Sequence, residues 1–263
     1  VPTLAYNVLA YNQATSRDTI NLVGIAVGNG VTDYNYDNND ALAEMVWSHS
    51  LAEYGFQQRY QTACKDPDSD ACGVVTDYLN DVIFNNINIY DIYGICVPGP
   101  SQLRYTPWIK VKGAIDPSTV PPCADWAGIE NYLLNQTVRQ ALHIPDSVQQ
   151  WTFCTDALNY TSNTQYGSIY TYPFMMASHI KILIYSGDVD CAVPFTGTRA
   201  WIANLNLTAK SDYEPWYGND GQLAGYKQDF AGLSFVTIRG SGHTVPQDKP
   251  AQAYKMIYDF INN

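Results

Sequence analysis

Residues 180–190 read IKILIYSGDVD, an apolar run that ends in a glycine and two aspartates. A short run rich in isoleucine and leucine is typical of a strand that is buried on both faces of a parallel sheet. Asp188 and Asp190 follow at the point where this strand must end. Because open α/β sheets carry their polar chemistry in the loops after the strands, this stretch predicts both a fold class and the place of a site.

Two other segments extend the predicted sheet. Residues 20–27 (INLVGIAV) read as a buried strand closed by a tight Gly28-Asn29-Gly30 turn, and residues 233–239 alternate as a further strand. Helical spacing occurs in the opening stretch (Leu4, Val8, Tyr11), around residues 199–205 and from Pro250 onward. Strands that alternate with helices predict an α/β fold with a mostly parallel sheet.

Residues 32–160 have a different residue pattern from the rest of the chain. Short helical patterns, prolines and cysteines replace the strand signals. We therefore expect core segments at residues 1–31 and 161–263, separated by an inserted, mostly helical and disulfide-stapled cap at residues 32–160.

A second polar motif follows the last predicted strand. Residues 240–246 read GSGHTVP, so glycines and a stiff turn flank His243. A serine-type hydrolase needs an imidazole to take the serine proton and a carboxylate to fix the imidazole tautomer. His243 and an aspartate of the 188–190 pair are the candidate catalytic residues, in the order typical of α/β-hydrolase folds. Position alone does not show whether Asp188 or Asp190 orients the imidazole. The carboxylate that does not is expected to cap its turn or the following helix.

The remaining chemistry-bearing residues carry weaker signals. The other three histidines lie in apolar or helical surroundings and are expected to be structural: His49, His143 and His179. Cys191 is expected to be a buried, inert thiol rather than a reactive one. The serine elbow G-x-S-x-G, which should supply the nucleophile, does not occur in the chain.

Composition excludes several partners. The 263 residues include 25 Asp and Glu against 14 Lys and Arg, a formal net charge of −11 that repels phosphate backbones and makes nucleic acid an unsuitable partner. No apolar stretch reaches the length of a membrane span. The cysteine spacing matches no metal motif, and we expect neither a metal nor a cofactor.

Cysteines and glycosylation sequons indicate an oxidising compartment. Cys64 and Cys72 bracket a polar loop that a disulfide could close. Three N-x-[ST] sequons occur, at Asn135, Asn159 and Asn206. Together they favour a secreted or a lysosomal/vacuolar location.

With these motifs in place, the chain resembles the serine carboxypeptidases, the group that includes cathepsin A and the vacuolar carboxypeptidases of plants and fungi. Residues 185–194 look like the family's catalytic-Asp block and residues 240–246 like its catalytic-His block. Further family-like pieces follow one another in the right order, at residues 28–33, 88–93, 138–143 and 215–217. The resemblance implies an α/β-hydrolase fold with an inserted cap.

The resemblance also implies residue roles. Asp190 becomes the triad acid, His243 the base and Asp188 a supporting residue, while Cys191 and Thr244 lie near the leaving-residue side of the substrate cleft. The implied cysteine pairing is Cys64–Cys72, Cys96–Cys123, and Cys154 with a cysteine in a missing N-terminal segment, which leaves Cys191 free.

In the family a G-E-S-Y-A-G block carries the nucleophile and leads into a dipeptide that Val1-Pro2 resembles. We therefore expect that the serine segment and the Asn-Gly-Gly-Pro-Gly oxyanion loop are missing, and that this chain alone is inactive. The chain is interpreted as the C-terminal piece of a cleaved enzyme, an incomplete chain, or a truncated homologue that acts as a binding protein. The third interpretation is disfavoured because it exposes strand edges and a broad apolar face.

With its serine segment, the predicted enzyme removes single C-terminal amino acids from peptides through an acyl-enzyme, at acidic pH. The same scaffold supports two alternatives, an acyltransferase that uses sugar esters and a hydroxynitrile lyase. The expected partners are peptide substrates and the N-terminal segment or chain of the same enzyme, and a homodimer is left open.

Overall fold

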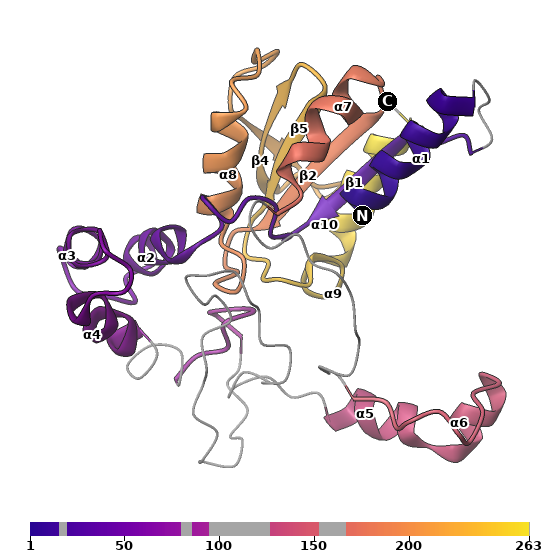
Figure 1. The fold of residues 1–263 in the computed structure, drawn as a ribbon, viewed down its shortest axis with the longest axis horizontal. Coiled ribbons are helices and arrows are strands. Elements are labelled where there is room, and N and C mark those ends of the chain that lie inside the picture. Colours follow the sequence, from indigo (N-terminus) through magenta and orange to yellow (C-terminus); the bar gives the residue numbers. More distant parts are fainter. Residues whose placement is uncertain (16–19, 80–85, 95–126, 153–166, 263) are drawn as a thin grey trace.

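The computed structural model describes residues 1–15, 20–79, 86–94, 127–152 and 167–262. Its centre is a five-stranded sheet with strand order β1-β2-β5-β4-β3 (Figure 1). The strands are β1 (Gly24–Gly28), β2 (Lys181–Gly187), β3 (Glu214–Tyr217), β4 (Leu223–Phe230) and β5 (Leu233–Ile238).

Helices flank the sheet and also occur in the described parts of the segment between β1 and β2. They are α1 (Pro2–Thr15), α2 (Asn39–Ser48), α3 (Phe56–Ala63), α4 (Asp70–Tyr78), α5 (Ala127–Leu134), α6 (Gln136–Ala141), the 3₁₀ turn η2 (Ile169–Thr171), α7 (Tyr172–Ala177), α8 (Phe195–Asn204), α9 (Val245–Asp248) and α10 (Pro250–Asn262). In the described ranges no helix has both the length and the apolar character that crossing a bilayer requires.

The parallel part of the sheet forms in the three predicted segments, but β1 begins only at Gly24, and Ile20 and Val23 of the predicted 20–27 strand lie before it and are exposed. β2 pairs in parallel with β1 on one side and with β5 on the other. Ile182 and Ile184 pack into a cluster with residues of α7 and α8, whereas Leu183 packs into a second cluster with residues of α9 and α10. Because helices cover both faces, every position of β2 from 182 to 184 is buried, which explains the unbroken apolar run.

The other edge of the sheet differs from the expectation. β4 runs antiparallel to both β5 and β3, and the sequence patterns predict neither β3 nor β4. Gly225 in β4 has φ 157°, and a Cβ there would overlap the carbonyl oxygen of Thr237. Trp216 of β3 closes this corner because its Nε1 donates to the same Thr237 oxygen at 3.0 Å.

Helices α2 to α4 form a small apolar cluster of their own. Phe56 and Tyr60 of α3 are its largest fully buried side chains, and it includes Val189 and Cys191 from the loop after β2. The predicted Cys64–Cys72 disulfide is present and links the end of α3 to α4. This helical unit therefore packs directly against the loop that carries the candidate carboxylates.

Several expectations fall on residues outside the described ranges. These are the Cys96–Cys123 pairing, the partner of Cys154 and the sequon at Asn159. The cap boundaries at residues 32 and 160 stay a prediction.

Candidate active site

Asp190 and His243 meet at the edge of the sheet where β2 and β5 end. The two strands run in parallel with Gly187 opposite Ile238, so the loops after them leave the sheet side by side. His243 Nδ1 lies 2.8 Å from Asp190 Oδ2. The Asp190 side chain is completely buried, whereas the side chain of His243 is 34% exposed. The carboxylate of Asp190 is thus shielded from solvent, whereas the imidazole of His243 is partly accessible to it.

Asp190 is held by donors at both oxygens. Oδ1 accepts from the backbone N–H groups of Ala192 at 2.8 Å and Val193 at 3.2 Å. Oδ2 accepts from Asn29 Nδ2 at 2.8 Å in addition to the His243 ring. A buried carboxylate needs such partners, and these fix the plane of the group.

His243 is fixed through its main chain and its ring. Its backbone N–H donates to the carbonyl oxygen of Tyr90 at 2.7 Å, and the Tyr90 ring centroid lies 5.2 Å from that of His243. Because Asp190 Oδ2 accepts, we assign the ring proton to Nδ1, which leaves the Nε2 lone pair available. Within the described residues, Nε2 has no hydrogen-bond partner.

The charge around the ring favours the imidazolium. Burial lowers the pKa of His243, but the hydrogen bond and charge of Asp190, together with the charge of Asp248, outweigh it and raise the pKa above its ordinary value. Asp248 stays close because its Oδ2 accepts from the Gly242 N–H at 2.8 Å. A base with a raised pKa and an available Nε2 is suited to accept a proton and to hold it as a cation.

The geometry separates the two aspartates, between which position along the chain alone does not choose. Asp190 faces the imidazole, whereas Asp188 Oδ1 accepts from the Gly240 N–H at 2.6 Å. Asp188 therefore ties the loop after β2 to the loop after β5, rather than capping its own turn or α8. Burial raises the pKa of Asp188, and the Gly240 N–H partly offsets that effect.

Two residues of this site are missed by the sequence patterns. In the sequence, Asn29 is recognised only as part of a tight turn, and Tyr90 is recognised only as part of a family-like segment. Asn29 has one usable signal, because it is a polar residue directly after a strand that is parallel to β2. Tyr90 acts here through its backbone oxygen, and a sequence carries no signal for that.

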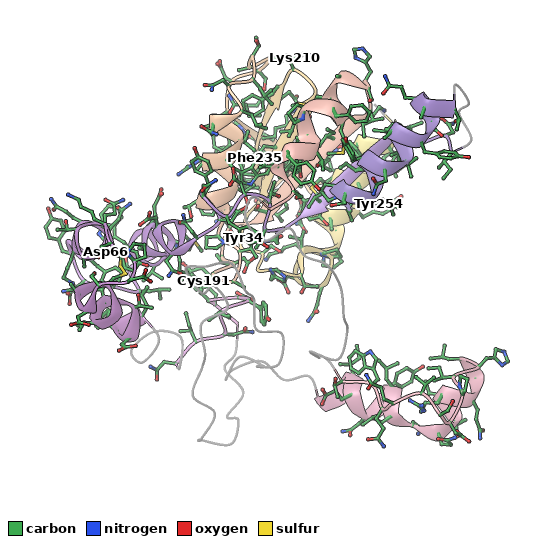
Figure 2. The ribbon with its side chains drawn as sticks, in the orientation of Figure 1. Tyr34, Asp66, Cys191, Lys210, Phe235 and Tyr254 are labelled. Atoms are coloured by element: carbon green, nitrogen blue, oxygen red, sulfur yellow. A yellow bond between two sulfur atoms is a disulfide. The ribbon has the colours of Figure 1, made fainter. Side chains whose placement is uncertain are left out.

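Cys191 and Thr244 lie next to the pair but in opposite surroundings. Cys191 is 3% exposed, and burial raises the pKa of its thiol. Figure 2 shows it just beyond the strands, whereas Phe235 lies within the sheet. Thr244 is exposed and directly precedes α9. Of the two, only Thr244 is available to a molecule in solvent.

The other three histidines are not part of this pair. The Nδ1 of His49 is 3.0 Å from the carbonyl oxygen of Met45, while His143 and His179 are exposed residues with positive φ. Among the described side chains, no three His, Cys, Asp or Glu residues are grouped as a metal site requires.

The chain is similar to known proteins along its whole length. The family model for serine carboxypeptidase matches residues 1–263. Serine carboxypeptidase-like 25 of Arabidopsis thaliana is 33% identical over 279 residues, which cover 99% of this chain and 58% of the relative. Lysosomal protective protein of Mus musculus is 32% identical over 305 residues, which cover 100% of this chain and 62% of the relative.

A solved structure shares the fold. The crystal structure of Kex1(Δ)p, a prohormone-processing carboxypeptidase from Saccharomyces cerevisiae, superposes with a TM-score of 0.72 at 18% identity, over 99% of this chain and 59% of that one. The chain thus spans about 60% of the length of the relatives it matches. From the match along its full length, the chain belongs to the serine carboxypeptidase family.

Proposed function

We propose that this chain is the C-terminal part of a serine carboxypeptidase that removes single C-terminal amino acids from peptides. The observation that carries the proposal is the pair of buried Asp190 and partly exposed His243, 2.8 Å apart at the carboxyl edge of the parallel strands. The nucleophilic serine comes from a segment or chain outside this sequence, which contains no G-x-S-x-G.

In the proposed reaction His243 moves a proton twice. As the serine oxygen bonds to the carbonyl carbon of the last peptide bond, its proton passes to His243 Nε2. The C–N bond then breaks, and the terminal amino acid leaves with that proton. Water repeats the sequence on the acyl-enzyme and releases the shortened peptide and the free serine. Asp190 keeps the imidazolium oriented and stabilised without taking its proton.

The test uses the complete enzyme, with the segment that precedes this chain in its relatives. His243→Ala and Asp190→Asn are each expected to lower kcat by about 10⁴-fold, the order of magnitude measured for triads elsewhere. His179→Asn is the matched control, because His179 is exposed and its positive φ is one that asparagine tolerates. Release of amino acids is followed by mass spectrometry on peptides with free and amidated C-termini.

The same assay separates the alternative functions. A glucose ester and a cyanohydrin are tested beside the peptides. Turnover of only one of these would identify an acyltransferase or a hydroxynitrile lyase, and full peptidase activity in the His243→Ala variant would contradict the triad assignment. Peptide binding without any turnover by the complete protein would indicate a binding protein.

The intact mass decides how the serine is supplied. A second polypeptide released only by reductant would mean a two-chain enzyme joined through Cys154. A single heavier chain that reductant leaves undivided would mean one continuous polypeptide. Either result is consistent with the proposed function, and this chain alone is expected to be inactive.

The proposal extends to the surroundings of the site and to the compartment. Thr244, exposed beside His243, is proposed to line the side of the cleft that receives the leaving residue, with Cys191 buried near the same side. Residues 32–160 are proposed to cap the cleft. The sequons at Asn135 and Asn206 are exposed, and with the Cys64–Cys72 disulfide they support a glycosylated enzyme in the lysosome, the vacuole or the extracellular space.

A further inference from the structure

Asn29 lies 161 positions before Asp190 in the chain, yet its side chain touches the triad carboxylate. We propose that Asn29 is a positioning residue, whose amide holds Asp190 in the orientation that presents Oδ2 to His243. The consequence for catalysis rests on the function proposed above, whereas the effect on the imidazole does not. The contacts around Asn29 carry the argument.

The direction of the hydrogen bond is fixed by a neighbour. The backbone N–H of Gly187 donates to Asn29 Oδ1 at 3.3 Å. Because a backbone N–H can only donate, the amide oxygen must face Gly187 and the NH₂ group must face Asp190. The Asn29 amide is therefore a donor to the carboxylate, 2.8 Å from Oδ2.

The backbone places Asn29 for this role. Its N–H donates to the carbonyl oxygen of Tyr185 at 2.9 Å, which continues the β1–β2 pairing one residue beyond Gly28. Its φ of 46° lies in the left-handed region, which asparagine tolerates better than most side chains do. The residue is only 4% exposed, so its amide is held against the carboxylate rather than in solvent.

The contact from Asn29 completes a set of four hydrogen-bond donors around the Asp190 carboxylate. Asn29 and His243 share Oδ2, each at 2.8 Å, while the N–H groups of Ala192 and Val193 take Oδ1. A neutral donor stabilises the carboxylate without adding a cation that would compete with the imidazolium. Within the described residues, His243 is the only ion-pair partner of Asp190.

Loss of the amide has two expected effects. The carboxylate keeps its ion pair with the imidazole but is oriented less firmly, so the ring is misaligned, and a misplacement on the order of 1 Å lowers rates by about 100-fold. The carboxylate charge is also less satisfied, so it attracts the imidazolium more strongly and raises the pKa of His243 further.

Two substitutions in the complete enzyme test the proposal. Asn29→Gly keeps the left-handed backbone and removes the amide, while Asn29→Asp keeps the shape and replaces a donor with a second carboxylate. Both are expected to lower kcat by about 10- to 100-fold, with KM changed by less than about twofold. The acid limb of the pH profile of kcat/KM should move to higher pH in both variants, and this shift should be larger for Asn29→Asp than for Asn29→Gly. Ser50→Gly is the control, an exposed residue with φ 58°.

A second readout does not depend on turnover. The downfield Nδ1–H resonance of His243, assigned by its loss in His243→Ala, reports the imidazole titration in the same proteins. It should titrate at higher pH in both Asn29 variants and as in the parent in Ser50→Gly. If Asn29→Gly does not fold, the isosteric Asn29→Asp variant decides the question.

The outcomes separate the two proposals. If the parent enzyme lacks peptidase activity but the resonance shifts in the Asn29 variants, the proposed function fails and the positioning role stands. If the parent cleaves peptides and the variants lose only thermal stability, with kcat, the acid limb and the His243 titration unmoved, Asn29 is merely structural and the positioning role is overturned.

Discussion

At the residue scale, Gly187 lies where the two loops of the site cross. A Cβ at this position would overlap the carbonyl oxygens of Ser241 and Gly242 and lie 2.7 Å from the carbonyl carbon of Ser241. These are backbone atoms, so no side-chain rotation can relieve the clash. The same crossing is held by the hydrogen bond from Val189 N–H to the Ser241 oxygen at 3.0 Å.

Gly187→Ala is therefore expected to push the loop of Asp190 away from that of His243. We expect it to destabilise the complete enzyme by about 1–3 kcal/mol, the usual cost of overpacking, and to lower kcat as well. The midpoint of urea denaturation measures the first effect and peptide turnover the second.

A glycine in open surroundings provides the control for this variant. A Cβ at Gly73 in α4 would meet no heavy atom within 4 Å, so Gly73→Ala should stabilise its helix by about 0.5–1 kcal/mol. If Gly187→Ala has the same urea midpoint as the parent, the two backbones do not approach each other as closely at Gly187 as the structure shows.

Sequence reasoning finds the residues whose chemistry is carried by short motifs. Asp190 and His243 stand out because each follows a predicted strand in a short loop that contains glycine and proline. Asn29 does not, since its function depends on a contact with a residue 161 positions away. Position along the chain does not choose Asp190 over Asp188, because both carboxylates follow the same strand. The family resemblance assigns Asp190, and the structure places Asp190 against His243.

At the element scale, the sequence predicts the buried strands best. β2 is found because helices on both faces demand apolar residues at successive positions, and β5 is found by its alternation. β1 is found only in part, because the strand begins at Gly24 and the preceding Ile20 and Val23 of the predicted run are exposed. β4 is missed because its sequence, LAGYKQDF, is half polar and is interrupted by Gly225. α1 is found by its spacing, yet Leu4 and Tyr11 of the predicted apolar stripe are exposed, and the buried residues are Pro2 and Ala5.

The disulfide between α3 and α4 gives a prediction at this scale. Cys64 and Cys72 are eight positions apart, so the bridge closes a short loop and should contribute about 2–3 kcal/mol. Because Phe56, Tyr60 and Val75 still pack together without it, the double variant Cys64→Ser/Cys72→Ser should fold but open locally more often. Limited proteolysis at residues 65–69 is expected to become at least several-fold faster.

A neighbouring surface position serves as the comparison. Val74 lies on α4 but is 69% exposed, so Val74→Ala should be cleaved like the parent. Equal cleavage of the double cysteine variant and the parent would show that apolar packing alone keeps α3 and α4 closed.

At the scale of the whole molecule, several buried ionisable groups favour the protonated state. Asp37 is the strongest case, because burial raises its pKa to about 7, against the opposing effect of the N–H groups of Thr32 and Asp33. Those groups donate to Oδ2 at 2.7 and 3.0 Å, while Oδ1 has no hydrogen-bond partner among the described residues. The charge of Asp33 raises the pKa further, and the Tyr172 hydroxyl is close enough to sense the Asp37 charge.

The pKa values of other groups are shifted in the same direction. Partial burial raises the pKa of Asp188 and Asp248, and the pKa of His243 is raised as well. In each case the folded state binds its proton more tightly than the unfolded chain does, so stability falls as pH rises between the two pKa values. The net charge of −11 at pH 7 adds self-repulsion in the same direction.

The complete enzyme is therefore expected to unfold at a higher temperature near pH 5 than near pH 7.5. For Asp37 the unfolded carboxyl titrates near 3.8 and the folded one at about 7, so its contribution is complete below pH 4 and lost as pH rises to 7. The slope in that window is at most about 1.4 kcal/mol per pH unit. This direction suits an acidic compartment.

Asp37→Asn tests the argument, since asparagine can still accept from the Thr32 and Asp33 N–H groups but carries no charge. Its Tm should exceed that of the parent at pH 7.5 by more than at pH 4.5, which flattens the pH dependence. Asp212→Asn removes a charge of the same sign from an exposed site and should leave the slope unchanged. If Asp37→Asn and the parent lose stability in parallel from pH 4.5 to 7.5, the buried carboxylate does not set the slope, and the net charge remains as its cause.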